Sequence, residues 1–420
     1  MILKSITYKL FITSLLVSAF CLPVLIPSWH GKLLVFLGLV WILSLKSEEV
    51  INVFKRNLLF IIILILILIE VTGLLFSTNT KSGLATIESI APLMILPLFI
   101  FSSEALIDNK VIHYALVSFV AGVIILNLAS LIFISYDLWD PKNLQSNIIL
   151  ANNSIVQIHP AFVSLYLSFC VFFLIDQYFP LQTANRSKLG WILFSLVILI
   201  TYLVWINSRT GILGFSMAFL FYSIFRFKAK ARIISLSILT VFLFIIFSVP
   251  FSRERFFNTP LIAVQGEASI DSHDPNIFPL VARKQILDCS IEILKGPELL
   301  YGYGTGDFRD VLQACYQDRN YNTLYEKGLD EHNEYFAQLH RHGIIGLVLF
   351  MALLVVPFKY AIKHCSPLLA VFIILFAVTA LFENVFSAQK GVTFFALFCP
   401  LLMLYARKKY ETDPVADSSV

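Results

Sequence analysis

The sequence has 420 residues, of which 58% are hydrophobic and only 14% are charged. Soluble globular chains are about half apolar and a quarter charged, so this composition argues against a soluble multidomain protein. The apolar residues come in long blocks, and a helix of about 20 apolar residues crosses the roughly 30 Å hydrocarbon core of a bilayer. The formal net charge of +4 identifies no partner class, and we expect no nucleic-acid partner.

Twelve apolar blocks predict an all-α polytopic membrane protein with about twelve transmembrane helices. Lys4 and Lys9 precede the first block, but no small-residue cleavage site follows it, so we expect an uncleaved first helix and not a signal peptide. The predicted spans are residues 8–27, 31–45, 57–76, 84–101, 111–135, 159–179, 189–206, 211–226, 231–250, 343–363, 366–381 and 388–405.

Basic residues are distributed unevenly over the connections between these spans. One set of alternate connections carries 17 lysines and arginines, and the short connections on the other side carry five. Cytoplasmic loops carry an excess of basic residues, so both termini are predicted to be cytoplasmic. The expected location is the bacterial inner membrane, with the long polar segment 251–342 on the outer, periplasmic face.

We therefore expect three parts: helices 1–9 in residues 1–250, a periplasmic loop subdomain in 251–342, and helices 10–12 with a cytoplasmic tail in 343–420. Within the loop, 281–295 has the apolar spacing of an amphipathic helix that Gly296-Pro297 ends. The glycine-rich stretch 302–308 predicts a turn, because the Lys-Ser/Thr of a phosphate-binding loop is missing. Residues 307–318 and 331–343 should be helical.

Two cysteines, Cys289 and Cys315, lie in this loop. An oxidising compartment would let them form a disulfide, but the sequence does not give their separation, so pairing stays open.

Charged residues at the outer ends of the spans are the first candidates for chemistry. Arg209 lies at the outer end of the seventh span, where a planar, permanently charged guanidinium suits a phosphate; the alternative is a side chain that snorkels to the interface. Arg283 and Lys284 lie at the start of the amphipathic loop helix, where a solvated polar face is the ordinary interpretation.

His332 lies in a cluster of titratable residues that includes Glu331, His340 and His342. The spacing matches no common metal motif, so we expect no metal and no cofactor. A histidine can accept a proton from a hydroxyl near neutral pH, which makes His332 a candidate general base. The alternative is a polar helix end at the membrane surface.

Further polar residues are predicted on the same outer face. His159 precedes the proline that begins the sixth span, and Glu383 and Asn384 follow the eleventh span. Glu70 lies late in the third span. Carboxylates inside a membrane are functional candidates by default, but that expectation weakens close to the interface.

Three stretches resemble the O-antigen ligase and polymerase superfamily. They are SRTGILG (208–214), the Arg283 helix followed by the turn GYGTGDF (302–308), and EHNEYFAQLHRHGIIGL (331–347), of which the last is the most specific. Their order, and the large loop before the last spans, are also similar to the family. The turn departs from the family pattern by a tyrosine, and residues 319–329 match no family pattern.

The resemblance implies a metal-independent, inverting glycosyltransferase. The donor would be an undecaprenyl-diphosphate-linked glycan and the acceptor a sugar hydroxyl of lipid A–core. His332 would be the base, and Arg209 and Arg283 would neutralise the diphosphate; Asn333, His159, Glu383 and Lys284 would bind substrate.

Two alternatives remain open from the sequence. One is a polysaccharide polymerase or a protein O-oligosaccharyltransferase with the same chemistry. The other is a non-enzymatic glycolipid transporter, although the ionisable mid-bilayer groups and broken helices typical of proton-coupled transporters are scarce here.

Overall fold

The computed structural model describes residues 2–44, 47–137, 152, 155–178, 186–248, 250–253, 256 and 278–412. These residues form helices and no β-strand, which confirms the all-α class. The helices are α1 (Ile2–Val24), α2 (Pro27–Ser44), α3 (Ser47–Arg56), α4 (Leu58–Leu75), α5 (Thr80–Ser102), η1 (Glu104–Leu106), α6 (Asn109–Asp137), α8 (Pro160–Tyr178), α9 (Arg186–Ile206), α10 (Arg209–Arg226), α11 (Ala229–Ser248), α12 (Pro250–Arg253), α14 (Phe278–Glu292), α15 (Glu298–Tyr301), α16 (Phe308–Asp318), α17 (Asn322–Glu326), α18 (Glu334–Lys363), α19 (Pro367–Ala380) and α20 (Gln389–Thr412).

Each predicted span coincides with one of these helices. Ten helices in the described residues are long and apolar enough to cross a membrane. The two other predicted spans are α19, which is apolar but has 14 residues, and α10, which has an arginine at each end. The chain is therefore a multi-pass membrane protein.

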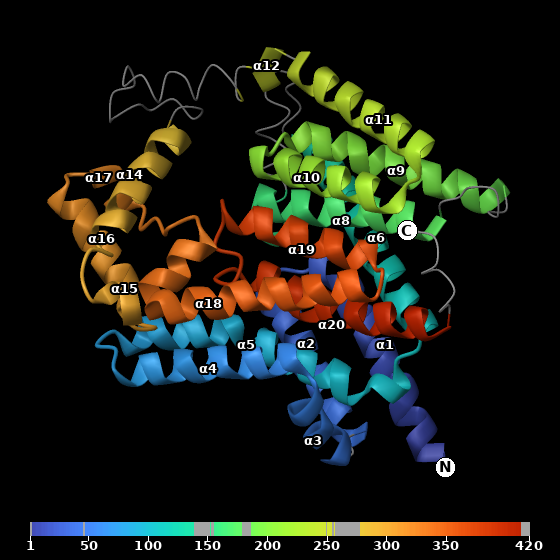
Figure 1. Ribbon diagram of the computed structural model, residues 1–420, viewed down its shortest axis with the longest axis horizontal. Helices are drawn as coiled ribbons and strands as arrows, with labels where there is room; N and C mark the ends of the chain where they lie inside the picture. Colours follow the sequence, from blue (N-terminus) through green and yellow to red (C-terminus); the bar gives the residue numbers. More distant parts are fainter. Residues whose placement is uncertain are drawn as a thin grey trace.

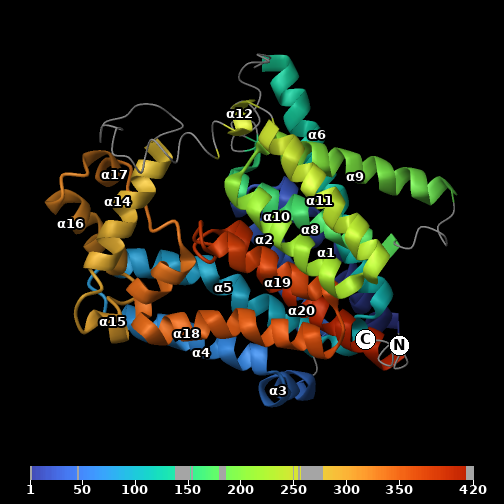
Figure 2. The same cartoon turned by 45° about the horizontal axis from the view of Figure 1, so that its top comes forward.

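The long helices lie side by side, and α14 to α17 lie together at one end of them (Figure 1). Helix α1 begins and α20 ends at the opposite end (Figures 1 and 2). This arrangement agrees with an even number of crossings. Residues 257–277 of the predicted loop and the tail from 413 lie outside the described part.

The centre of the helix bundle is formed by α8, α19 and α20. In the apolar stretches of α8 and α20, 78% and 89% of the residues are buried, whereas in α11 only 11% are. Aromatic side chains fill this centre: the rings of Phe169 and Phe372 lie 5.3 Å apart, and those of Phe169 and Phe398 lie 5.8 Å apart. A rigid centre of this kind fixes the ends of α8 and α19, where polar residues meet.

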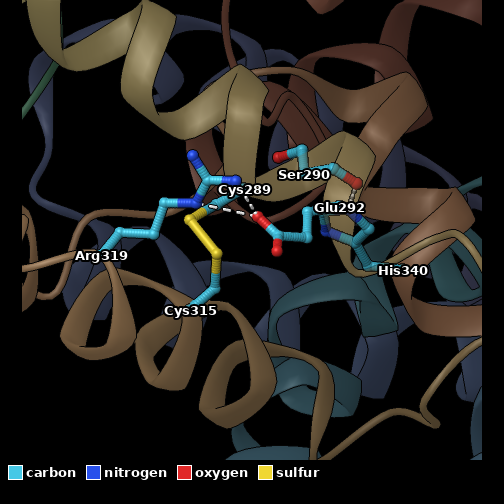
Figure 3. The surroundings of a disulfide bond; sticks show 6 residues. All are labelled: Cys289, Ser290, Glu292, Cys315, Arg319 and His340. Carbon is cyan, nitrogen blue, oxygen red and sulfur yellow. Dashed lines mark hydrogen bonds and ion pairs between the residues drawn. A yellow bond between two sulfur atoms is a disulfide. The ribbon is translucent and has the colours of Figure 1, made fainter.

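Helices α14, α16 and α17 share a small apolar core of their own, which includes Ile286, Leu312 and Leu324. A disulfide between Cys289 and Cys315 joins α14 to α16 within this core (Figure 3). The pairing that the sequence left open is thus present. An exposed ion pair between Arg319 and Glu292 lies beside it.

The glycine-rich turn docks on a break in α18. His342 and Gly343 have non-helical dihedral angles, which leaves carbonyl groups of the preceding turn without helical partners. The N–H groups of Tyr303 and Gly304 donate to the carbonyls of His340 and Arg341, at 2.7 and 2.9 Å. The sequence-based interpretation as a turn is confirmed, and its physical role is to hold α18 by main-chain hydrogen bonds.

Glycine is required on both sides of this contact. Gly302 has φ +73°, and a Cβ there would lie 2.4 Å from the carbonyl carbon of Arg341. Gly343 has φ +60°, and a Cβ there would lie 2.3 Å from the carbonyl carbon of Leu300. Only a residue without a side chain allows two backbones to approach this closely in the left-handed region.

Candidate active site

A single carboxylate, Glu383, gathers basic groups from three distant parts of the chain. Glu383 lies in the connection between α19 and α20, and its side chain is only 8% exposed. Its Oε1 lies 3.5 Å from Nη2 of Arg283 and 3.5 Å from Nδ1 of His159. Its Oε2 lies 3.5 Å from Nδ1 of His332. Four residues proposed from the sequence thus meet in one place.

His332 is held by a local turn just before α18. Its backbone N–H donates to Oδ1 of Asp330 at 3.1 Å, and its φ of +47° lies in the left-handed region. Such a conformation is uncommon for a residue other than glycine, and histidine tolerates it better than most. The turn aims the ring towards Glu383 and leaves the side chain 31% exposed.

The charge environment of His332 suits proton transfer. Burial acts to lower the pKa of His332, but its hydrogen bond to Glu383 and the charge of Asp330 outweigh it, so the pKa lies above its ordinary value of 6.5. Conversely, burial acts to raise the pKa of Glu383, but His332, His159 and Arg283 together hold it below its usual range. The pair therefore favours an imidazolium beside a carboxylate.

Arg283 contacts the site from the side of α14. Its Nη2 donates to the carbonyl of Phe382 at 3.3 Å, and its guanidinium lies 5.6 Å from the centre of the Phe382 ring. Lys284, its neighbour in sequence, is exposed on α14. The structure thus separates the two basic residues, since only Arg283 is directed at the Glu383 cluster.

Arg209 lies at the same end of the bundle. Ser208 caps α10 by accepting a hydrogen bond from the N–H of Gly211, and the close approach of Gly211 to Ser164 aligns the start of α10 with the start of α8. Deeper along α10, the Cβ position of Gly214 lies 3.7 Å from Val378 of α19. Because α10 and α19 run in opposite directions, Arg209 lies level with Glu383 along the bundle.

Asn333 serves mainly as a connector. Its side-chain oxygen caps α18 by accepting hydrogen bonds from the N–H groups of Tyr335 and Phe336, and its amide donates to the carbonyl of Leu381 at 3.1 Å. Its backbone N–H donates to Oδ1 of Asn384 at 2.8 Å. These contacts tie the start of α18 to the connection that carries Glu383.

A buried chain of polar contacts links the connection between α19 and α20 to α14. Asn384 donates to Glu331 at 3.0 Å, and Glu331 lies 2.9 Å from Nδ1 of His340. Nε2 of His340 donates to the carbonyl of Ser290 at 3.2 Å (Figure 3). Burial acts to raise the pKa of Glu331, but the hydrogen bond and charge of His340 lower it overall. The chain links the disulfide-bonded α14 to the residue next to Glu383.

A second buried cluster surrounds Arg341, whose side chain is fully buried. Its guanidinium lies 2.9 Å from Glu70 and 3.6 Å from Glu334, and it donates to Ser387 at 3.0 Å. His342 lies 3.0 Å from the other oxygen of Glu70. His340, Arg341 and His342 are all buried, so the alternative interpretation of this segment as a polar helix end at the membrane surface is wrong for them.

Sequence reasoning missed the central position of Glu383 and the roles of Asp330, Asn384 and His340. Hydropathy predicts at which end of the membrane helices these residues lie, but it does not predict which residues they contact. The one available signal was the density of polar residues around His332. Among the described residues, no group of three histidine, cysteine or acidic side chains is arranged to hold a metal ion.

Part of the chain matches a known protein family. Residues 194–351 match the family described as O-antigen ligase (Wzy_C). This range contains Arg209, Arg283 and His332, while Glu383 and His159 lie outside it. No curated protein matches the chain significantly. Residues 194–351 of this multi-pass membrane protein therefore form an O-antigen ligase family domain.

Proposed function

We propose that the chain is an O-antigen ligase that transfers a glycan from undecaprenyl diphosphate to a sugar hydroxyl of lipid A–core. The observation that carries this proposal is the convergence of His332, Arg283 and His159 on the buried Glu383, within a domain of this family. Transfer of this kind needs a base for the acceptor hydroxyl and positive charge for the leaving diphosphate, and this cluster offers both.

His332 acts as the base. Its Nδ1 faces Glu383, so Nε2 is the nitrogen that accepts the proton of the acceptor hydroxyl. As the proton moves, the hydroxyl oxygen forms a bond to the anomeric carbon and the bond from that carbon to the diphosphate oxygen breaks. Direct displacement inverts the anomeric configuration. Glu383 keeps the ring oriented and stabilises the imidazolium that forms, as a carboxylate does beside a catalytic histidine.

Arg209 and Arg283 neutralise the leaving group. A diphosphate gains negative charge as its bond to the sugar breaks, and a guanidinium pairs with phosphate oxygens in a bidentate manner. Two arginines supply this charge without a divalent ion. His159 and Lys284 are proposed to contact the glycan or diphosphate, and Asn333 to hold the loop around them.

The proposed orientation places this cluster on the periplasmic face of the inner membrane. The support is the excess of basic residues in the alternate connections, which places both termini in the cytoplasm. The lipid tail of the donor then lies against the helices, with its diphosphate level with Arg209.

The test is the glycan profile of a null strain complemented with wild type, His332→Ala or Arg209→Ala. We expect loss of the lipopolysaccharide ladder and accumulation of carrier-linked glycan with either variant, at wild-type levels of inserted protein. A normal ladder with either variant would contradict the role given to that residue.

The same experiment separates the alternatives. Loss of long chains with single repeats still on the core would identify a polymerase. Unchanged lipopolysaccharide with loss of glycosylated protein would identify a protein O-oligosaccharyltransferase. A transporter would tolerate His332→Ala and fail with substitutions deep in the bundle.

A further inference from the structure

A charged cavity lies at the opposite end of the bundle from Glu383. Its volume is about 650 Å³, and it is formed by α3 and the nearby ends of α4, α5, α18 and α20. Four basic side chains line it together with two carboxylates, those of Glu49 and Glu104. The basic residues are Arg56, Lys359, Lys363 and Arg407.

Each contributing helix presents one face to the cavity. Val356, Lys359, Tyr360 and Lys363 follow the spacing of a single helical face on α18. Lys359 and Lys363 are thereby adjacent like charges, an arrangement that destabilises a helix unless an anion lies between them. The faces converge, so the cations come together from separate parts of the chain.

Three of the four cations lack a protein partner. Arg407 is ion-paired with Glu104. Across the described part of the chain, the side chains of Arg56, Lys359 and Lys363 make no hydrogen bond or ion pair. An excess of cytoplasmic basic residues would by itself scatter such charges over the surface, and it does not explain their position around one cavity.

Much of the rest of the cavity wall is apolar and is formed by Leu58, Leu59, Phe101, Val356, Met403 and Leu404. Uncharged polar groups of Asn52, Asn57, Ser102 and Tyr360 complete it. A free anion gains nothing from the apolar part of this wall, whereas a lipid places its phosphate among the cations and its chains along the apolar surface.

We propose that this cavity binds the phosphate headgroup of an anionic membrane phospholipid. The lipid phosphate bridges Arg56 on α3 to Lys359 and Lys363 on α18, with Arg407 of α20 beside it. The acyl chains lie along the start of α4, where Leu58 is exposed. Bound lipid thus joins the amphipathic helix α3 to the helices that carry the candidate active site at their other ends.

The test measures binding to the full-length protein purified in an uncharged detergent. Thermal unfolding is followed during titration with phosphatidylglycerol, with phosphatidylcholine of the same chains, and with glycerol 3-phosphate. We expect a saturable rise in Tm with phosphatidylglycerol alone. Equal effects of all three, or an effect of glycerol 3-phosphate alone, would overturn the proposal of a lipid site.

Matched variants locate the effect. Lys359→Gln/Lys363→Gln should weaken the apparent affinity for phosphatidylglycerol by about tenfold or more. Lys228→Gln/Lys230→Gln, which removes two exposed lysines at the start of α11, should leave it unchanged. Arg56→Gln, on a separate helix, provides an independent probe if the double variant folds poorly. Wild-type affinity in the Arg56 and the Lys359/Lys363 variants would refute the site.

Discussion

Replacing Arg341 tests the buried polar cluster that holds α4 against α18. Arg341→Met keeps much of the side-chain volume and removes the charge. It leaves Glu70 and Glu334 buried without their guanidinium. Removing one partner of a buried ion pair costs about 3–5 kcal/mol, because the remaining charge cannot be solvated.

The structure indicates a value near the lower end of that range. Glu70 keeps His342 at 3.0 Å, and Glu334 keeps the N–H of Phe386 at 2.9 Å and the amide of Gln338 at 2.7 Å. We therefore expect the free energy of unfolding to fall by about 3 kcal/mol. Adding Glu70→Gln should restore part of it, with a coupling of about 0.5–3 kcal/mol.

The measurement is unfolding in mixed micelles titrated with a denaturing detergent. Arg319→Met is the matched control, because Arg319 pairs with Glu292 of α14 at the protein surface and exposed ion pairs contribute little to stability. The reasoning fails if Arg341→Met unfolds at the same detergent fraction as Arg319→Met.

Three further predictions concern the candidate site and its loop. Arg283→Ala should lower kcat by roughly 100-fold or more, because a charge that stabilises the leaving group is lost, whereas Lys284→Ala should change KM. Transfer kinetics with a lipid-linked glycan distinguish the two variants. Equal effects on kcat would contradict the different positions of the two side chains on α14. In the wild type, transfer should rise with pH through a pKa above 6.5, because only neutral His332 accepts a proton. Glu383→Gln replaces the carboxylate that raises this pKa with a neutral amide, so the rise should move to lower pH in the pH–rate profile, and an unmoved midpoint would exclude the pairing. Cys289→Ser opens the 26-residue loop closed by the disulfide and should destabilise the subdomain of α14, α16 and α17 by about 3.5 kcal/mol. Thermal unfolding measures this change, and unfolding at the wild-type Tm would show that the disulfide does not contribute to stability.

The sequence was sufficient for the helices because hydropathy acts locally. An unbroken apolar run such as residues 58–69 must satisfy its backbone groups within the helix, whatever surrounds it. The amphipathic pattern in the loop likewise predicted α14, although the helix begins three residues earlier than the predicted range, at Phe278. Local chemistry also gave the glycine turn, since no other residue suits the dihedral angles of Gly302.

Contacts between distant segments were beyond the sequence. Glu383 and His159 are more than 200 positions apart, and the order of the spans does not say which of them are neighbours. The same limit affected the polar residues after His332. Arg341 looks like a solvated charge in sequence, but Glu70 of a distant helix makes its burial possible.

The position of Arg283 and the support of Glu383 both depend on one helix outside the bundle. Arg283 and Ser290 are seven residues apart in α14, so they lie on the same side of the helix two turns apart. One contacts Glu383 directly, and the other accepts a hydrogen bond from His340, which reaches Asn384 through Glu331. The disulfide at Cys289 fixes α14 between these two contacts. Loop and membrane helices thus form one site, and a change in the docking of α14 would alter the charge around His332 without any change in the bundle.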